Sequence, residues 1–168
     1  MAMEIERKYL IELPAEDEFV RHNAVCWEIV QTYLRSENGV TARVRQVTEG
    51  EQIRCYHTEK RRVSDLTAEE NEREIDAGEY RKLLQLADAS LKPICKRRWR
   101  LPYGEHVLEV DVYPFWKKTA VLEIELDSEN DTAEIPAWIR VLKEVTGDVR
   151  FKNVSLAREV PVEDTLLS

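Results

Sequence analysis

The sequence predicts an α+β fold that is mainly β: a closed eight-stranded antiparallel β-barrel with helices packed outside it. Two observations predict it. Eight segments alternate in side-chain character with period two, which is typical of strands, and in seven of these the residues of one face are ionic. The two predicted amphipathic helices cover only part of so wide a sheet, whereas closing the sheet turns one face inward and removes its exposed edges.

The predicted strands cover residues 3–11, 26–34, 40–47, 52–60, 71–76, 94–103, 107–113 and 120–126. Asn38-Gly39 favours the primed turn that closes a hairpin between the second and third of them. Residues 61–71 are polar and are expected to form a mobile loop.

Helical segments interrupt this pattern. A short helix is expected over residues 15–23, and residues 77–88 place apolar side chains at helical spacing. A third helix is predicted over 136–145, with Pro136 in its first turn and Gly147 ending it. The last residues, 162–168, are expected to fray.

Composition narrows the class of protein. The 168 residues fit a single domain, 1–168, and 43% hydrophobic content argues against disorder. A net charge of −8 argues against a general nucleic-acid binder. Three cysteines without metal spacing suggest neither a disulfide framework nor a zinc site. Because no long apolar segment occurs, we expect a cytoplasmic protein with no membrane partner.

The ionic faces suggest the chemistry. The sets that share a face are Glu4, Glu6 and Lys8; Arg43 and Arg45; Arg54 and Lys60; Glu72 and Glu74; Lys96, Arg98 and Arg100; Glu109 and Asp111; Glu123 and Glu125. On any single strand such a face is ordinarily the solvent face. Repeated over seven strands of a closed barrel, the charges must face a hydrated or ligand-filled interior, because unpaired buried charges cost several kcal/mol. Carboxylates suit Mg²⁺ or Mn²⁺, and Arg and Lys suit phosphate, so a polyphosphate is the expected ligand.

The segment Glu4-Ile5-Glu6-Arg7-Lys8 is similar to the ExExK signature of CYTH domains, also called triphosphate tunnel metalloenzymes. The resemblance extends over nearly the whole chain. Segments similar to the later motifs of the family are QTYL at 31–34, RxR at Arg43 and Arg45, Lys60, ExE at Glu72 and Glu74, KxR at Lys96 and Arg98, ExD at Glu109 and Asp111, ExE at Glu123 and Glu125, and the closing GDVRFKN around Arg150 and Lys152.

The resemblance implies roles for these residues. Glu6, Lys8 and Glu125 are the expected catalytic residues, and Mg²⁺ or Mn²⁺ is the expected cofactor. The expected metal ligands are Glu4, Glu6, Glu123 and Glu125, with Asp111 as a further one. The remaining carboxylates supply a second metal site, orient water or hold basic neighbours. The expected substrate site consists of Lys8, Arg43, Arg45, Lys60, Glu72, Glu74, Lys96, Arg98, Glu109, Arg150 and Lys152. Arg150 is included from its position and not from a motif, and position alone also suggests Arg54 and Arg100 as further contacts.

Among the activities of this family, the compact chain most resembles the small bacterial triphosphatases. This implies hydrolysis of inorganic tripolyphosphate to pyrophosphate and phosphate, with weaker action on nucleoside triphosphates. Class IV adenylate cyclase, thiamine triphosphatase and a non-catalytic polyphosphate-binding or nucleotide-binding module stay open as alternatives, as does a homodimer formed through an outer apolar face. The four tryptophans are expected to pack rather than contact a base. Arg61 and Arg62 are either solvated or guide anions to the tunnel mouth.

Overall fold

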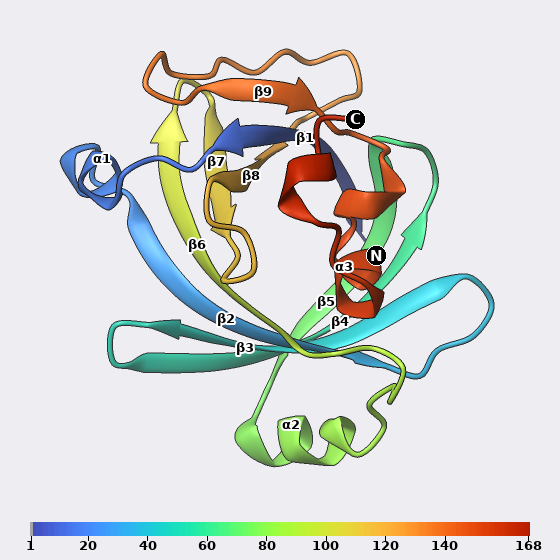
Figure 1. Cartoon of the computed structure of the whole chain (residues 1–168). Coiled ribbons are helices and arrows are strands. Elements are labelled where there is room, and N and C mark those ends of the chain that lie inside the picture. The colour runs from blue at the N-terminus through green and yellow to red at the C-terminus, as the bar shows by residue number, and fades with distance from the viewer. Residues whose placement is uncertain (1) are drawn as a thin grey trace.

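The computed structural model describes residues 2–168, which form a closed β-barrel with short helices around it (Figure 1). Its strands are β1 (Ala2–Glu12), β2 (Val25–Leu34), β3 (Val40–Glu49), β4 (Gln52–Arg62), β5 (Thr67–Ile75), β6 (Ile94–Tyr103), β7 (His106–Val112), β8 (Thr119–Glu125) and β9 (Val141–Glu144). Its helices are α1 (Glu16–Arg21), α2 (Ala77–Leu84) and α3 (Asn153–Arg158), with the 3-10 turns η1 (Val149–Phe151) and η2 (Glu163–Thr165).

Strand β1 closes the barrel. The sheet runs in the order β5-β4-β3-β2-β6-β7-β8-β1-β9, and β1 pairs with β5 as well. The first residues of β1, Ala2 to Ile5, pair with β5, while Glu6 to Glu12 pair with β8. All these pairings are antiparallel. The predicted eight-stranded antiparallel barrel is therefore confirmed, with β9 as an additional strand.

The helix predicted over residues 136–145 is wrong, because this segment contains β9. Beyond Ile5, β1 leaves β5, and its free edge pairs with β9 from Tyr9 to Ile11. The unpaired backbone groups of that edge form hydrogen bonds with β9, which outweighs the helical spacing of the apolar residues. Gly147 does have a positive φ of 79°, but in a turn after a strand rather than at a helix end.

The mobile loop predicted over residues 61–71 is also wrong for most of its length. Strand β4 extends to Arg62 and β5 begins at Thr67, so only a short turn separates them. Opposite charges on both faces explain this hairpin, since Lys60 pairs with Glu70 in register and Arg61 pairs with Glu69. Cross-strand pairs of opposite charge stabilise a sheet, although each residue taken alone is typical of a loop.

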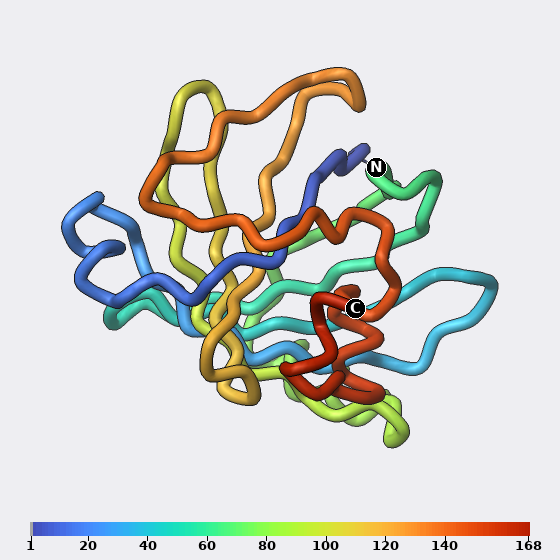
Figure 2. The backbone as a smooth tube through the Cα atoms, turned by 45° about the horizontal axis from the view of Figure 1, so that its top comes forward, coloured from blue at the N-terminus to red at the C-terminus, as the bar shows by residue number. Residues whose placement is uncertain are grey.

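The chain's last residues are ordered rather than frayed. The side chain of Leu166 is only 1% exposed, and it packs in an apolar cluster with Phe151 and Leu156. The carboxylate of Glu163 accepts backbone N–H groups of Lys117, Lys118 and Thr119 at 2.8–3.1 Å. The same cluster includes Leu10, Tyr33, Ile94, Tyr113 and Val121 from the barrel strands. The C-terminal segment therefore packs against barrel strands through apolar contacts, and Figure 2 shows it folded back onto the body of the molecule.

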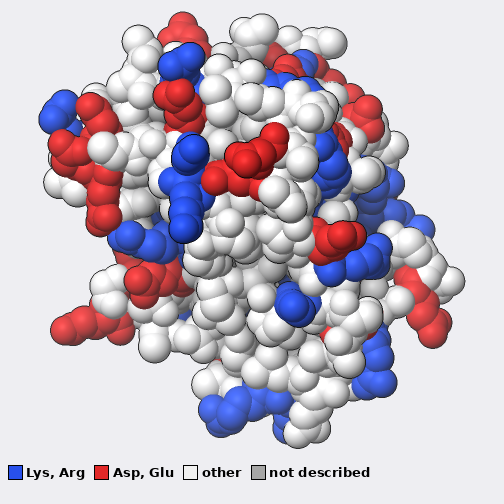
Figure 3. Space-filling model, in the orientation of Figure 1, with Lys and Arg blue, Asp and Glu red and all other residues white. Residues whose placement is uncertain are grey.

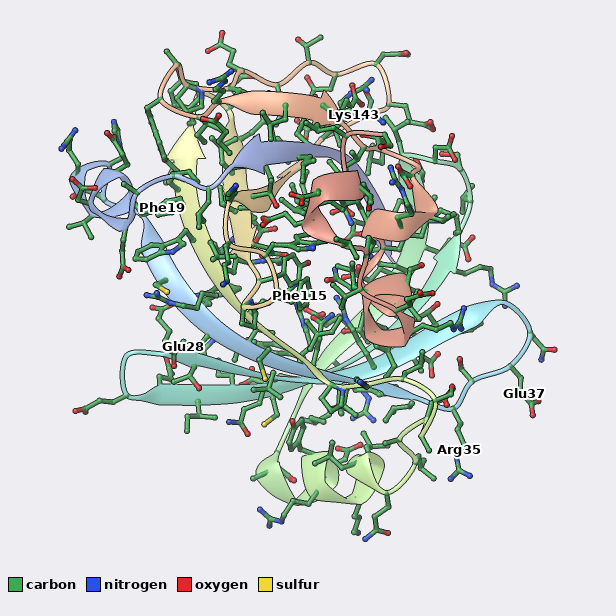
Figure 4. All side chains as sticks on the ribbon, in the orientation of Figure 1. Phe19, Glu28, Arg35, Glu37, Phe115 and Lys143 are labelled. Atoms are coloured by element: carbon green, nitrogen blue, oxygen red, sulfur yellow. The ribbon has the colours of Figure 1, made fainter. Side chains whose placement is uncertain are left out.

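The outer face of the barrel carries most of the remaining core. Phe19 of α1 stacks on Trp99 of β6 with ring centroids 4.8 Å apart, and Figure 4 shows it directed toward the sheet. On another part of the wall, Tyr80 of α2 packs in a cluster with Val44 and Cys55. With apolar residues buried outside, the ionic residues of the same strands face inward. Within residues 2–168, no helix has the length and apolar character needed to cross a membrane.

Candidate active site inside the barrel

A cavity of about 390 Å³ lies inside the barrel, within the range typical of small-molecule sites. Its walls are mainly ionic. The residues that line it are Glu4, Glu6, Lys8, Trp27, Tyr33, Gly39, Thr41, Arg43, Arg45, Thr58, Lys60, Arg62, Glu70, Glu72, Arg98, Glu109, Glu123, Glu125, Lys152, Asn153 and Val154. Thirteen of them are charged side chains from strands β1 and β3 to β8, so the period-two interpretation holds across the barrel.

The cavity has an acidic and a basic wall. Strands β1 and β8 are neighbours and contribute the carboxylates of Glu4, Glu6, Glu123 and Glu125. Strand β3 contributes Arg43 and Arg45, and it lies across the barrel from β1 and β8 in the strand order. On the outer face seen in Figure 3, by contrast, acidic and basic side chains are interspersed. The cavity therefore separates its charges by sign, unlike the face shown in Figure 3.

Like charges crowd on the acidic wall. Glu6 and Glu125 are register partners on β1 and β8. Burial, together with the neighbouring Glu123 and Glu4, raises the pKa of Glu6 to about 7. Burial and the charge of Glu4 also raise the pKa of Glu125. Both carboxyl groups therefore favour a nearby cation or a proton.

Lys8 links the acidic wall to the C-terminal segment. Its Nζ lies 3.4 Å from Oε1 of Glu123 and donates to the carbonyl oxygen of Phe151 at 3.1 Å. Burial alone would raise the pKa of Glu123, yet Lys8 and Arg98 lower it to about 2. Glu123 is therefore an anion that two cations hold in place.

Lys60 has the corresponding role at the other end of the acidic wall. Its Nζ lies 2.5 Å from Oε1 of Glu4 and 3.6 Å from Oε2 of Glu70. Burial raises the pKa of Glu4, and Lys60 opposes that shift. Glu70 is not among the expected site residues, because it lies before the strand predicted over residues 71–76. The alternation of Glu70 with Glu72 and Glu74 is the signal that would have found it.

The basic wall contains unused hydrogen-bond donors. Arg45 contacts Glu72 at 3.2 Å, and burial and the neighbouring Arg43 lower the pKa of Arg45 to about 10. The Nε atoms of Arg43 and Arg45 are both buried, and neither has an acceptor within residues 2–168. Because buried donors without partners are costly, these two groups favour an anion in the cavity.

A buried ionic cluster supports the cavity from behind. Asp111 is fully buried, with Lys96 Nζ at 2.7 Å and Arg98 Nε at 2.7 Å, and it does not line the cavity. Although burial opposes it, Arg98 and Lys96 hold the pKa of Asp111 well below its usual range. Arg98 also reaches Glu123 at 3.2 Å. Asp111 was expected to be a further metal ligand, but its oxygens are occupied by Lys96 and Arg98, so it instead holds basic neighbours in place.

Besides Lys96 and Asp111, two further expected site residues do not line the cavity. Glu74 is exposed on β5, opposite Tyr56 in register. Arg150 pairs with Asp148 at 2.9 Å and donates to the carbonyl oxygen of Thr165 at the C-terminal segment. Neither lines the cavity, and Arg150 instead anchors the last residues of the chain.

The cavity also includes polar residues that the sequence did not single out. Thr58 donates to Glu72 at 2.7 Å, and the hydroxyl of Tyr113 donates to Asn153 at 2.6 Å. Thr58 shares a face with Lys60, so strand alternation was the available signal. Asn153 follows Lys152 at the start of α3, a helix that was not predicted. Arg62 lines the cavity too, so the second of its two predicted roles, guiding anions, fits its position.

The acidic wall suits a hard divalent cation by its donor chemistry. Within residues 2–168, no group of three carboxylate, histidine or cysteine side chains is already arranged to hold a metal ion. Mg²⁺, however, usually binds through one or two carboxylates together with water and substrate phosphates. Oε1 of Glu123 is buried and makes no hydrogen bond, and Glu6 carries a raised pKa. These two residues fit a cation that binds together with its substrate.

Solved structures resemble this barrel. The inorganic triphosphatase NE1496 is 25% identical to this chain with a TM-score of 0.58, and the match covers 96% of this chain and 99% of NE1496. PH1012 from Pyrococcus horikoshii OT3 is 21% identical with a TM-score of 0.55, covering 76% of this chain and 80% of that protein. HpAC1 from Hippeastrum, a protein with a dominant triphosphatase activity, is 15% identical with a TM-score of 0.51, covering 74% and 80%.

No protein-family model matches the chain, and neither does any curated protein. The match to NE1496 nevertheless spans nearly the whole of both chains. The ExExK residues Glu4, Glu6 and Lys8 all line the cavity, as the signature requires. Fold, motif placement and overall match are therefore all consistent with a CYTH, or triphosphate tunnel, protein.

Proposed function

We propose that this protein hydrolyses inorganic tripolyphosphate to pyrophosphate and phosphate in the presence of Mg²⁺ or Mn²⁺, with weaker action on nucleoside triphosphates. One observation carries the proposal: a single cavity of about 390 Å³ has carboxylates on one wall and arginines with unused buried donors on the opposite wall. A chain of phosphates bridged to a cation satisfies both walls at once. The likeness to NE1496, an inorganic triphosphatase, supports the same substrate class.

In this proposal the basic wall binds the phosphate chain. Arg43 and Arg45 donate from buried Nε atoms, and planar guanidinium groups match phosphate oxygens better than ammonium groups do. Lys152 and Arg62 also line the cavity, and burial and Arg62 lower the pKa of Lys152. An anion bound between Lys152 and Arg62 would reduce the electrostatic repulsion between these two cations. These four basic residues, called the phosphate cradle below, therefore favour a ligand with closely spaced negative charges.

Glu4, Glu6, Glu123 and Glu125 would hold the divalent cation. When bound, the cation would neutralise phosphate charge and polarise the phosphoryl group. The side chains that now contact these carboxylates, Lys60 on Glu4 and Lys8 on Glu123, are positioned to move to phosphate oxygens as the acidic wall gains a cation. Binding of cation and substrate would then be mutually dependent.

The chemical step we propose is in-line attack of a water oxygen on a terminal phosphorus. The new P–O bond forms as the bond from that phosphorus to the bridging oxygen breaks, and pyrophosphate leaves. Glu6, which lies opposite Glu125 in register on the acidic wall, would accept the proton of the attacking water. Lys8 stabilises the negative charge on the leaving oxygen, and Glu125 orients the water. Positioning and fixed positive charge supply most of the rate enhancement.

The test is a panel of tripolyphosphate, ATP and thiamine triphosphate, each with Mg²⁺ and with Mn²⁺, scored for released phosphate and for cyclic AMP. We expect phosphate from tripolyphosphate and no cyclic AMP from ATP. Glu6→Ala and Glu125→Ala should abolish metal-dependent turnover with the fold intact, whereas Glu59→Ala, on the exposed face of β4, should not.

Four results would contradict the proposal or one of its residue assignments. Cyclic AMP formation without phosphate release would indicate a cyclase, and a preference for thiamine triphosphate would indicate that activity. Binding of tripolyphosphate and metal without any turnover would indicate a binding module. Full activity in the Glu6→Ala protein would remove the assignment of that residue.

A further inference from the structure

A second cavity, of about 220 Å³, lies beside the first and shares Trp27 as a wall. It is lined by Trp27, Val47, Glu49, Gln52, Arg54 and Tyr56. These residues continue the inner faces of β2, β3 and β4: Val47 follows Arg43 and Arg45 at spacing two, and Tyr56 precedes Thr58 and Lys60. The second cavity is thus an extension of the same inner surface toward the turn between β3 and β4.

Strand register connects this extension to the phosphate cradle. Tyr56 lies opposite Arg45, and Trp27 lies opposite Arg98. Both arginines line the main cavity. A group attached to a phosphate held at Arg45 and Arg98 would therefore meet the two aromatic rings first.

The lining of the second cavity differs from that of the main one. Two aromatic side chains and Val47 give it apolar surface, and Arg100 stacks on the Trp27 ring at 4.3 Å. The indole Nε1 of Trp27 donates to the carboxylate of Glu49, which fixes the ring. Flat rings stack on such surfaces with little dependence on their identity.

Charge does not favour a longer phosphate chain as the occupant. Glu49 and Arg54 both line the second cavity, so its two charged side chains have opposite signs, and Glu74 lies opposite Tyr56 in register on the neighbouring strand. The second cavity therefore lacks the excess of cations that the basic wall of the main cavity offers to phosphates. Arg100 adds little positive charge, because its Nε already donates to Glu109 at 2.9 Å. The remaining polar groups, such as the Gln52 amide, suit the ring nitrogens and amino group of an uncharged heterocycle.

We propose that the pocket formed by Trp27 and Tyr56 binds the base of a nucleoside triphosphate while its phosphates occupy the main cavity. This rests on the proposed function, since it assigns a subsite for the weaker, organic substrates of the same active site. Tripolyphosphate has no group that reaches this pocket. Stacking therefore contributes to the binding of ATP and not to that of tripolyphosphate.

The experiment compares ligands with and without a base. In the wild-type protein, isothermal titration with the non-hydrolysable analogue adenylyl imidodiphosphate and with ribose 5-triphosphate should give tighter binding of the adenine compound by about tenfold, the size expected for one stacked base. Tyr56→Leu should remove this difference, and Tyr56→Phe should keep it. Ile53→Ala is the matched control, because Ile53 neighbours the pocket residues in sequence but is 60% exposed on the opposite face of β4.

Kinetics provides the second measurement. Tyr56→Leu should raise KM for ATP about tenfold relative to KM for tripolyphosphate. Equal binding of the two ligands by the wild-type protein, or a proportional change of both KM values in Tyr56→Leu, would overturn the proposal. If the wild-type protein turns over no triphosphate, the proposed function fails. The titration still decides the question of the pocket, because it requires binding alone.

Discussion

The ammonium group of Lys96 lies 2.7 Å from the carboxylate of Asp111, and neither side chain has any exposed surface. These residues come from neighbouring strands, β6 and β7, and Asp111 also accepts two hydrogen bonds from Arg98. Asp111 thus joins Lys96 and Arg98, two cations whose expected role is direct contact with the phosphates. Arg98 alone of the three lines the cavity. The pair therefore acts as a support that fixes Arg98 at the cavity wall.

Replacing Lys96 tests this support. Lys96→Met removes one of the two cations on a buried carboxylate, and breaking a buried pair in this way typically costs about 3 kcal/mol of unfolding free energy. Urea unfolding followed by circular dichroism measures the loss. Lys92→Met, an exposed lysine before the same strand, should leave the midpoint unchanged. Equal midpoints for the two variants would show that Lys96 is dispensable for stability.

Glu6 should make the metal-free protein less stable at alkaline pH. Its pKa is raised in the folded state to about 7 from an ordinary value of 4.5. The folded protein therefore holds this proton more tightly than the unfolded chain does. As pH rises from 4.5 through 7, the folded state loses stability, up to about 3 kcal/mol above pH 7. Glu6→Gln should remove that cost.

The prediction is that Glu6→Gln melts at a higher temperature than the wild-type protein at pH 8 in EDTA. The difference should shrink as pH falls from 7 to 4.5, because the wild-type carboxyl becomes protonated. Thermal unfolding across this pH range measures it, with the exposed Glu59→Gln as the matched control. A stability gain that does not vary with pH would show that charge on Glu6 is not the cause.

Arg45 should be important for substrate affinity. Its buried Nε has no acceptor within the described part of the chain, and its pKa is lowered to about 10 by burial and by the neighbouring Arg43. A charge-assisted hydrogen bond contributes about 1.5–3 kcal/mol, so Arg45→Gln should raise the dissociation constant for tripolyphosphate roughly 10- to 100-fold. Calorimetric titration measures this value.

Arg61→Gln is the control for Arg45→Gln. Arg61 has the same charge but is exposed on β4, where it lies opposite Glu69 in register. It should change affinity less than about twofold, since surface charges contribute little to binding at physiological salt. If both variants weaken binding equally, general electrostatic attraction rather than a built phosphate cradle explains the affinity.

The regular strands show why most of the barrel was predictable from sequence. Glu4, Glu6 and Lys8 alternate without interruption, so a period-two pattern alone places them on one face, and that face lines the cavity. The period-two pattern of a single strand does not predict which strands pair with each other. Arg61 and Glu69 are register partners, so the segment predicted as a loop forms a hairpin of β4 and β5. Because β5 begins earlier than predicted, Glu70 belongs to this strand and lines the cavity.

Roles that depend on side-chain partners were harder to predict than positions. Asp111 and Glu109 share a motif and a strand face, yet Glu109 lines the cavity and Asp111 is occupied by Lys96 and Arg98 behind it. Arg150 lies in the closing motif but pairs with Asp148, two residues away. The partner of a charged side chain depends on contacts in the folded structure that strand periodicity does not reveal. The segment 136–145 was mispredicted for the same reason, because only the free edge of β1 makes β9 a strand.

The C-terminal segment offers a closely matched pair of positions. Leu166 is 1% exposed in the cluster with Phe151, whereas its neighbour Leu167 is 58% exposed. Leu166→Ala should therefore lower the unfolding free energy by about 2–4 kcal/mol, the usual cost of truncating a buried leucine, and Leu167→Ala should change it by less than about 0.5 kcal/mol. Because the carbonyl of Phe151 accepts from Nζ of Lys8, loosening this cluster should also reduce turnover of tripolyphosphate. Urea unfolding and phosphate release on the two purified variants measure both effects, and equal stabilities would mean that the tail does not pack in solution.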